Sequence, residues 1–98
     1  MELSKIKSYI GFSIKSRSIK YGVDDILKTK GESLILFSDS LATSSLEKLK
    51  NFASQKKCEV FEFSSDDFKM LFDGNESVKA VAVLDKNLAI AIKKNMTN

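Results

Sequence analysis

The chain has 98 residues, of which 43% are hydrophobic and 30% are charged, a composition typical of a single folded domain and unlike that of a disordered chain. It has one cysteine and no histidine, which excludes an internal disulfide, the common zinc sites and the nucleophile triads that use histidine. The formal net charge of +3 is too small to identify a nucleic-acid partner by itself.

No segment of the sequence is typical of a membrane span or a secretory signal. The longest apolar runs, LILF (34–37) and AVAVL (80–84), are too short to cross a bilayer. The first residues carry charges where a signal peptide has its apolar core, and a lone cysteine suits a reducing compartment. We therefore expect a cytoplasmic protein that does not bind membranes.

The first part of the chain predicts a helix, a short strand and a second helix. The first helix is expected over residues 3–17, where apolar side chains recur at helical spacing. Gly11 inside it predicts the close approach of another backbone. A strand over residues 19–21 follows, and then a helix over residues 24–30 that stands between two glycines. The inward positions of the first helix are Leu3, Ile6, Ile10 and Ile14.

The middle of the chain predicts strand, helix and strand. Residues 33–38 are apolar at nearly every position, as in a strand that helices cover on both faces. Ser44 and Glu47 fit a capping box at the start of the next helix. Residues 59–63 form the following strand.

The last third of the chain predicts helix, strand and helix. Ser65 is expected to cap a short helix, with two aspartates at its positive end. After a turn at residues 73–75, a strand is expected over residues 78–84, and Asp85 is expected to cap a final helix. The inward side chains of that helix are Leu88, Ala91 and Ile92. The tail NMTN (95–98) is expected to fray.

Helices and strands alternate over the whole chain, which predicts an α/β fold: a three-layer α/β/α sandwich around a small mixed sheet. Proline is absent and no change of composition marks a linker, so residues 1–98 are expected to form one domain. Most tyrosines and phenylalanines fall on apolar faces of these elements. We expect them in the core rather than as platforms for base stacking.

Basic residues concentrate in the first third of the chain. Residues 1–31 hold seven basic and three acidic side chains, a net charge of +4, whereas the remainder has a net charge of −1. Such asymmetry favours an anionic partner on one side of the domain. A solvated helix face explains the charge pattern equally well.

The residue types that common catalysis needs are missing. Without histidine there is no usual general base near neutral pH, and the four glycines fit neither a dinucleotide fingerprint nor a phosphate-binding loop. The adjacent pairs Asp24–Asp25 and Asp66–Asp67 point about 100° apart on a helix, which does not suit paired-carboxylate catalysis. We therefore expect a protein that is not an enzyme and that uses no cofactor or metal.

The stretch SIKYGVDDILKTKG (18–31) places two carboxylates inside the basic region. Asp24 and Asp25 could accept hydrogen bonds from the donor edge of guanine in a distorted RNA helix, while basic side chains contact phosphates. The alternative is structural: the aspartates stabilise the start of a helix, and Asp24 pairs with Lys28. Residue chemistry alone favours the structural interpretation.

Three segments together resemble the ribosomal protein family L-seven-Ae, which shares its fold with L-thirty-e, and in particular its small bacterial YlxQ-type members. The segments are GFSIKSRSIKYGVDDILK (11–28), LILFSD (34–39) and LFDGNESVKAVAVLDKNLA (71–89). The resemblance implies an α/β/α sandwich and binding of the kink-turn. This RNA helix is sharply bent at a bulge that tandem sheared G·A pairs follow.

The resemblance also implies which residues contact the RNA. The positions matched to the recognition helix of the family are Gly22, Val23, Asp24, Asp25 and Lys28. Asp24 and Asp25 take the place of a polar pair, commonly Asn-Glu, that reads the guanines; aspartate can only accept hydrogen bonds. Loop 73–78 resembles the one that cradles the flipped-out bulge nucleotide.

Two hypotheses about function follow. The leading one is non-catalytic binding of structured RNA, such as a kink-turn in ribosomal RNA, with ribosomal proteins as a second class of partner and no DNA expected. The alternative is a protein-interaction module that keeps the fold and has lost the RNA site. The residues expected to contact RNA are Lys15, Arg17, Lys20, Gly22, Val23, Asp24, Asp25, Lys28, Lys30, Gly74, Asn75 and Glu76.

Overall fold

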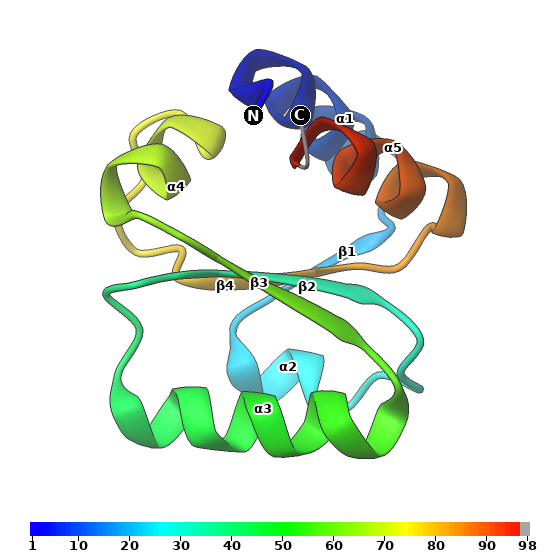
Figure 1. Ribbon diagram of the computed structural model, residues 1–98, viewed down its shortest axis with the longest axis vertical. Helices are drawn as coiled ribbons and strands as arrows, with labels where there is room; N and C mark the ends of the chain where they lie inside the picture. Colours follow the sequence, from blue (N-terminus) through cyan, green and yellow to red (C-terminus); the bar gives the residue numbers. More distant parts are fainter. Residues whose placement is uncertain (97–98) are drawn as a thin grey trace.

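Four strands form one mixed sheet in the computed structural model, which describes residues 1–96 (Figure 1). The strands are β1 (Ile19–Tyr21), β2 (Leu34–Ser38), β3 (Glu59–Phe63) and β4 (Ala80–Val83). Their order across the sheet is β1-β4-β2-β3. Strands β2 and β3 are parallel, and β4 is antiparallel to both β1 and β2. Strands β1, β2 and β3 therefore end at one edge of the sheet, where β4 begins; we call it the carboxyl edge.

Helices cover both faces of this sheet (Figure 1). One face carries α1 (Leu3–Lys15), α4 (Ser65–Leu71) and α5 (Lys86–Met96), and the other carries α2 (Val23–Ile26) and α3 (Thr43–Lys56). The predicted three-layer α/β/α sandwich around a small mixed sheet is confirmed. Within residues 1–96, no helix is both long and apolar enough to span a membrane.

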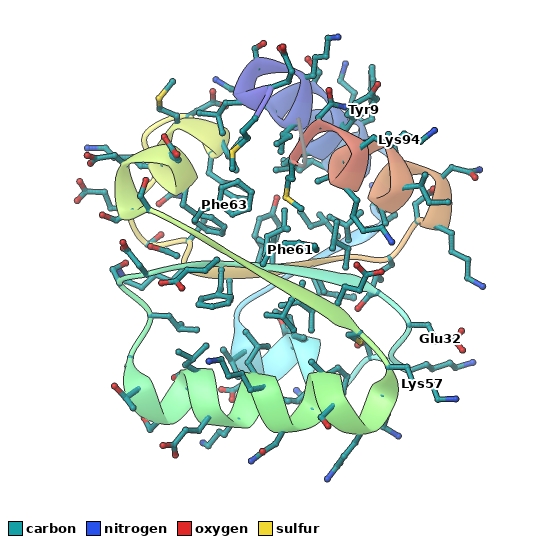
Figure 2. The ribbon with its side chains drawn as sticks, viewed as in Figure 1. Tyr9, Glu32, Lys57, Phe61, Phe63 and Lys94 are labelled. Carbon is teal, nitrogen blue, oxygen red and sulfur yellow. The ribbon has the colours of Figure 1, made fainter. Side chains whose placement is uncertain are left out.

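Each face of the sheet has its own hydrophobic core. Leu34 and Leu36 of β2 join the core under α1, α4 and α5, whereas Ile35 and Phe37 join the core under α2 and α3. All of β2 is buried, which explains why its sequence is apolar at consecutive positions. Side chains fill both spaces between the sheet and the helices (Figure 2), with Phe63 of β3 in the first of these cores.

Helix α1 buries a different set of side chains from the one predicted. Ser13 is fully buried, while Ile14 is 45% exposed. The hydroxyl of Ser13 donates to the carbonyl of Tyr9 at 3.1 Å, so the helix itself satisfies the buried polar group. The prediction that Ile14 faces the core is wrong, because Ser13 takes the buried position on the helix and Ile14 faces solvent. The prediction for Gly11 is also wrong, because a Cβ added there would have no neighbour within 4 Å.

Helix α2 is shorter than predicted. It ends at Ile26 rather than at Lys30, and a turn follows over residues 27–29. Lys28 therefore lies beyond the helix, and within residues 1–96 it forms no ion pair with Asp24. Of the structural interpretation, only the placement of Asp24 and Asp25 in the first turn of the helix is confirmed.

Other element boundaries differ from the prediction by a few residues. Helix α3 begins after an N-cap at Ala42 that makes no side-chain hydrogen bond, so Ser44 lies inside the helix and the predicted capping box is wrong. Strand β4 is shorter than the predicted 78–84. Of the tail expected to fray, residues 95 and 96 belong to α5, and residues 97 and 98 lie outside the described part of the chain.

The caps of the last two helices differ in how well the sequence predicts them. Helix α4 is capped by Ser64 rather than Ser65, since the Ser64 hydroxyl accepts from the N–H of Asp67 at 3.2 Å. Asp85 caps α5 as predicted: its Oδ1 accepts from the N–H of Leu88 at 3.0 Å.

Candidate functional site

A groove of about 560 Å³ lies at the carboxyl edge of the sheet; we call it the edge groove. The end of α1, the junction of β1 and α2, the connection after β2 and the segment from α4 to β4 all contribute to its lining. Of the predicted site residues, Gly22, Val23 and Asn75 line it. The structure thus brings the start of α2 and the 73–78 loop together.

Gly22 joins β1 to α2 beside the groove. Its φ of 83° and ψ of 151° fall in a region that is essentially restricted to glycine. Its N–H donates to the carbonyl of Ala80 at 2.9 Å, and its carbonyl accepts from the N–H of Ile26 at 3.1 Å. The glycine therefore holds the start of α2 against the start of β4.

Polar interactions hold the 73–78 loop in place. Asn75 Oδ1 accepts from both the N–H and the hydroxyl of Ser77, at 3.0 and 2.6 Å. Asp73 forms an ion pair of 2.7 Å with Lys7 of α1. The loop is thus closed on itself and tied to the first helix.

The other two predicted residues of this loop do not line the edge groove. Glu76 lines a neighbouring hollow of about 230 Å³ and pairs with Lys69 of α4 at 2.8 Å, whereas Gly74 lines neither space. The hydrogen bond from Lys69, and then its charge, lower the pKa of Glu76, and the same interactions raise the pKa of Lys69. Lys79 lines both spaces and donates to Ser40 Oγ at 3.0 Å.

Two aromatic rings stand on the surface where the sequence predicts core. Tyr21 is 41% exposed and lines the edge groove, and Phe12 is 52% exposed. The ring of Tyr21 lies edge-to-face against Phe72, with 6.3 Å between the ring centroids. Partial burial raises the pKa of the Tyr21 hydroxyl above its ordinary value. The core prediction is wrong for Tyr21 and Phe12.

A third space, of about 480 Å³, is lined by Lys20, Lys28 and Lys30 together with Asp25; we call it the lysine hollow. Side chains alternate along a strand, so Lys20 points to the face of β1 opposite to Tyr21. Within residues 1–96, none of the three lysines takes part in an ion pair. The hollow therefore combines three unpaired ammonium groups with one carboxylate.

The remaining predicted residues, Lys15, Arg17 and Asp24, line neither the edge groove nor the lysine hollow. All three are exposed. Lys15 is the last residue of α1, Arg17 lies in the turn to β1 with a φ of 57°, and Asp24 lies in the first turn of α2. The predicted residues are thus divided among the edge groove, the neighbouring hollow that Glu76 lines, the lysine hollow and exposed positions outside all three.

Sequence reasoning missed Leu41, Phe72 and Lys79, which also line the edge groove. Leu41 follows β2 and Lys79 precedes β4, and they meet because these two strands are antiparallel neighbours. Ligands of α/β sheets bind outside the carboxyl ends of strands. The predicted end of the strand over residues 33–38 could therefore have pointed to Leu41 as a residue of the site. No group of three metal-ligating side chains occurs in the described part of the chain.

The fold is shared with a protein of known structure. A solved structure of a protein of unknown function from Bacillus halodurans superposes with a TM-score of 0.80, covering 96% of this chain and 98% of that one, at 14% sequence identity. No family model matches the chain, and no curated protein matches it. The similarity shows the fold alone.

Proposed function

We propose that this protein is a non-catalytic, cytoplasmic RNA-binding protein related to the L-seven-Ae family, and that it binds a sharply bent, kink-turn-like RNA helix. The observation that carries the proposal is the edge groove. The resemblance assigns the start of α2 and the 73–78 loop to RNA recognition, and both segments line this groove although half of the chain separates them. We expect the target in ribosomal RNA, with ribosomal proteins as a second class of partner.

The lysine hollow supplies the electrostatic part of binding. Its three ammonium groups can contact phosphates without breaking an ion pair among residues 1–96. Lys20 and Tyr21 point to opposite faces of β1, so the hollow and the edge groove lie on different sides of this strand. A bent RNA can contact both surfaces at once.

Asp25 gives the lysine hollow a preference among RNA structures. A carboxylate repels phosphates and can only accept hydrogen bonds, so its place among the lysines favours RNA that presents donors there. Guanine offers N1–H and the N2 amino group in a distorted helix. The sheared G·A pairs of a kink-turn therefore suit this surface better than a regular duplex does.

An anisotropy titration with labelled kink-turn RNA, compared with a fully paired duplex of equal length, tests the proposal. We expect tighter, salt-sensitive binding of the kink-turn RNA. Lys28→Ala should weaken binding of both RNAs, because it removes a phosphate contact. Asp25→Ala should weaken binding of the kink-turn RNA alone, by about 1–3 kcal/mol.

Lys48→Ala on α3 is the matched control, since Lys48 is exposed and lines neither hollow. It should leave the preference for the kink-turn unchanged. A kink-turn RNA that does not bind the protein even at low salt would overturn the proposal. The absorbance ratio of the native protein after purification gives an early indication of bound nucleic acid.

Exposed apolar side chains favour a second candidate function, a protein-interaction module. Phe12 and Ile14 of α1 and Met70 of α4 are 52%, 45% and 60% exposed. A protein that co-purifies with this chain after nuclease treatment and at high salt, without any RNA binding, would support the second candidate against the first.

A further inference from the structure

The outer side of β3 is an open sheet edge. In the order β1-β4-β2-β3, strand β3 pairs with β2 on one side, and within residues 1–96 no strand pairs with its other side. In Figure 1, β3 crosses in front of the other strands, with α3 on one side of it and α4 and α5 on the other. Such an edge presents backbone N–H and C=O groups that can pair with another strand. We call this side of β3 the open edge.

One hydrogen bond shows which backbone groups face the open edge. The N–H of Asp39, just after β2, donates to the carbonyl of Phe63 at 2.9 Å, so the backbone of Phe63 faces β2. Backbone groups of successive residues in a strand point to opposite sides, so Phe61 also faces β2. The N–H and C=O groups of Val60 and Glu62 therefore face the open edge. Within residues 1–96, no backbone group of a loop or helix bonds to them.

The open edge is complementary to the same edge of a second copy that runs antiparallel to it. When Phe61 lies opposite Phe61 of the second copy, Val60 lies opposite Glu62 on both sides of that central pair. Opposite residues of this kind exchange both of their backbone hydrogen bonds. Each copy contributes two N–H and two C=O groups, so four hydrogen bonds form and every outward group of Val60 and Glu62 is satisfied.

The two neighbouring registers are less favourable. A register centred on Val60 needs the N–H of Cys58, which already donates to the carbonyl of Ala53 at 3.0 Å. A register centred on Glu62 places two carboxylates directly opposite each other, and like charges in that position destabilise a sheet. Charge and hydrogen bonding therefore both select the register centred on Phe61.

The side chains of β3 also suit that register. The two Phe61 rings meet in a pair without mutual hydrogen bonds, where opposite side chains lie closest, and aromatic pairs of this kind stabilise antiparallel strands. Phe61 is partly buried against the core under α1, α4 and α5 (Figure 2). Glu59 lies opposite Phe63 rather than a second carboxylate, and its charge is already paired with Lys93 of α5 at 2.7 Å.

We propose that this protein forms a twofold-symmetric dimer in which the open edges of two β3 strands pair antiparallel around Phe61. Two four-stranded sheets then become one sheet of eight strands. A twofold contact uses the same surface on both copies, so the assembly closes at two. Strand β1 lies at the far margin of each sheet, so this inference does not depend on RNA binding.

Sedimentation velocity over a range of protein concentrations tests the dimer. A single strand pair is a small interface, so we expect a dissociation constant of about 1–100 μM. Glu62→Pro removes one outward N–H from each copy, and with it two of the four hydrogen bonds. The dissociation constant should then rise by about 5- to 150-fold.

The position of Glu62 suits this substitution and offers a matched control. Its side chain is exposed, and proline is tolerated on an edge strand where its nitrogen faces solvent. Glu62→Gln keeps the backbone N–H and should dimerise at least as tightly as the wild type. Circular dichroism of both variants shows whether they fold.

Disulfide trapping tests the register even where Glu62→Pro does not fold. In a Cys58→Ser background, Phe61→Cys places two thiols in the central pair, with about 4.5 Å between their Cα atoms, a separation that a disulfide spans. Oxidation should then link the two chains. Glu62→Cys in the same background is the control: its two Cα atoms would be about 8 Å apart, too far for a disulfide.

Three results would overturn the proposal. The first is a wild-type protein that stays monomeric up to about 1 mM, including one that binds a strand of a different protein at this edge. The second is a dimer that a folded Glu62→Pro variant leaves unchanged, or that Glu62→Cys cross-links better than Phe61→Cys. The third is a series of oligomers that grows with concentration, because a twofold contact closes at two copies.

Discussion

Removing the charge of the lysine hollow should flatten the salt dependence of RNA binding. The change is the triple substitution Lys20→Gln, Lys28→Gln and Lys30→Gln, which keeps long polar side chains. Each phosphate that a lysine neutralises contributes about 0.9 to the slope of log affinity against log salt for B-form DNA and about 0.7 for a single strand; we use this range for the kink-turn RNA. With three phosphate contacts removed, the slope should fall by about 2 to 3.

The slope translates into a large difference in affinity. When salt rises fourfold, from about 50 to about 200 mM, the wild type should lose about 20- to 40-fold more affinity than the triple variant does. The stability of the folded protein should hardly change, because none of the three lysines forms an ion pair within residues 1–96. The assay is anisotropy with kink-turn RNA at several salt concentrations, with urea unfolding as the check on folding.

The protein offers a matched control at the opposite edge of the sheet. A hollow of about 220 Å³ there is lined by Lys57, Lys86 and Lys93 together with two glutamates. Glu32 and Lys57 lie beside the end of α3 (Figure 2). Substituting these three lysines by glutamine removes the same charge and should leave the slope close to that of the wild type. An equal flattening in both triple variants, or none in the first, would refute the assignment of phosphate contacts to the lysine hollow.

Two further predictions concern stability and the 73–78 loop. Gly31→Ala should lower the free energy of unfolding by about 2–5 kcal/mol, because φ is 98° there and the new Cβ would lie 2.5 Å from Lys56 Cβ. Gly11→Ala should raise the free energy of unfolding by about 0.5–1 kcal/mol, because Gly11 lies inside α1 and its new Cβ would meet no neighbour within 4 Å. Urea unfolding measures both, and equal effects would contradict the packing argument. In an NMR titration of carboxyl groups, Glu76 should titrate below its ordinary pKa, and Lys69→Gln should return it toward that value. Folding lowers the pKa of Glu76. The Lys69–Glu76 pair therefore stabilises the fold above the ordinary pKa of glutamate, and this stabilisation is lost as the pH falls through the lowered pKa of Glu76. An unchanged titration in Lys69→Gln would show that the pair does not form.

Local patterns in the sequence determined the order and type of the elements. The apolar run of β2 predicts a strand covered on both faces, and all of its residues are buried. Asp85 caps the last helix as its position predicts. Alternation of helices and strands predicts the three layers that the structure has. The strand and the cap follow from the sequence because each depends on residues within one strand or one turn, and the layers follow from the order of such elements.

Tertiary structure decided where the elements end and which side chains reach the surface. Tyr21 is apolar enough to suit a core, yet β1 ends at the edge groove and leaves it exposed. Ser13 is polar enough to suit the surface, yet the packing of α1 buries it and exposes Ile14. The candidate site depends on the placement of β4 between β1 and β2, which sets Leu41 and the 73–78 loop beside the start of α2. Such contacts join residues that are distant along the chain, and no local periodicity encodes them.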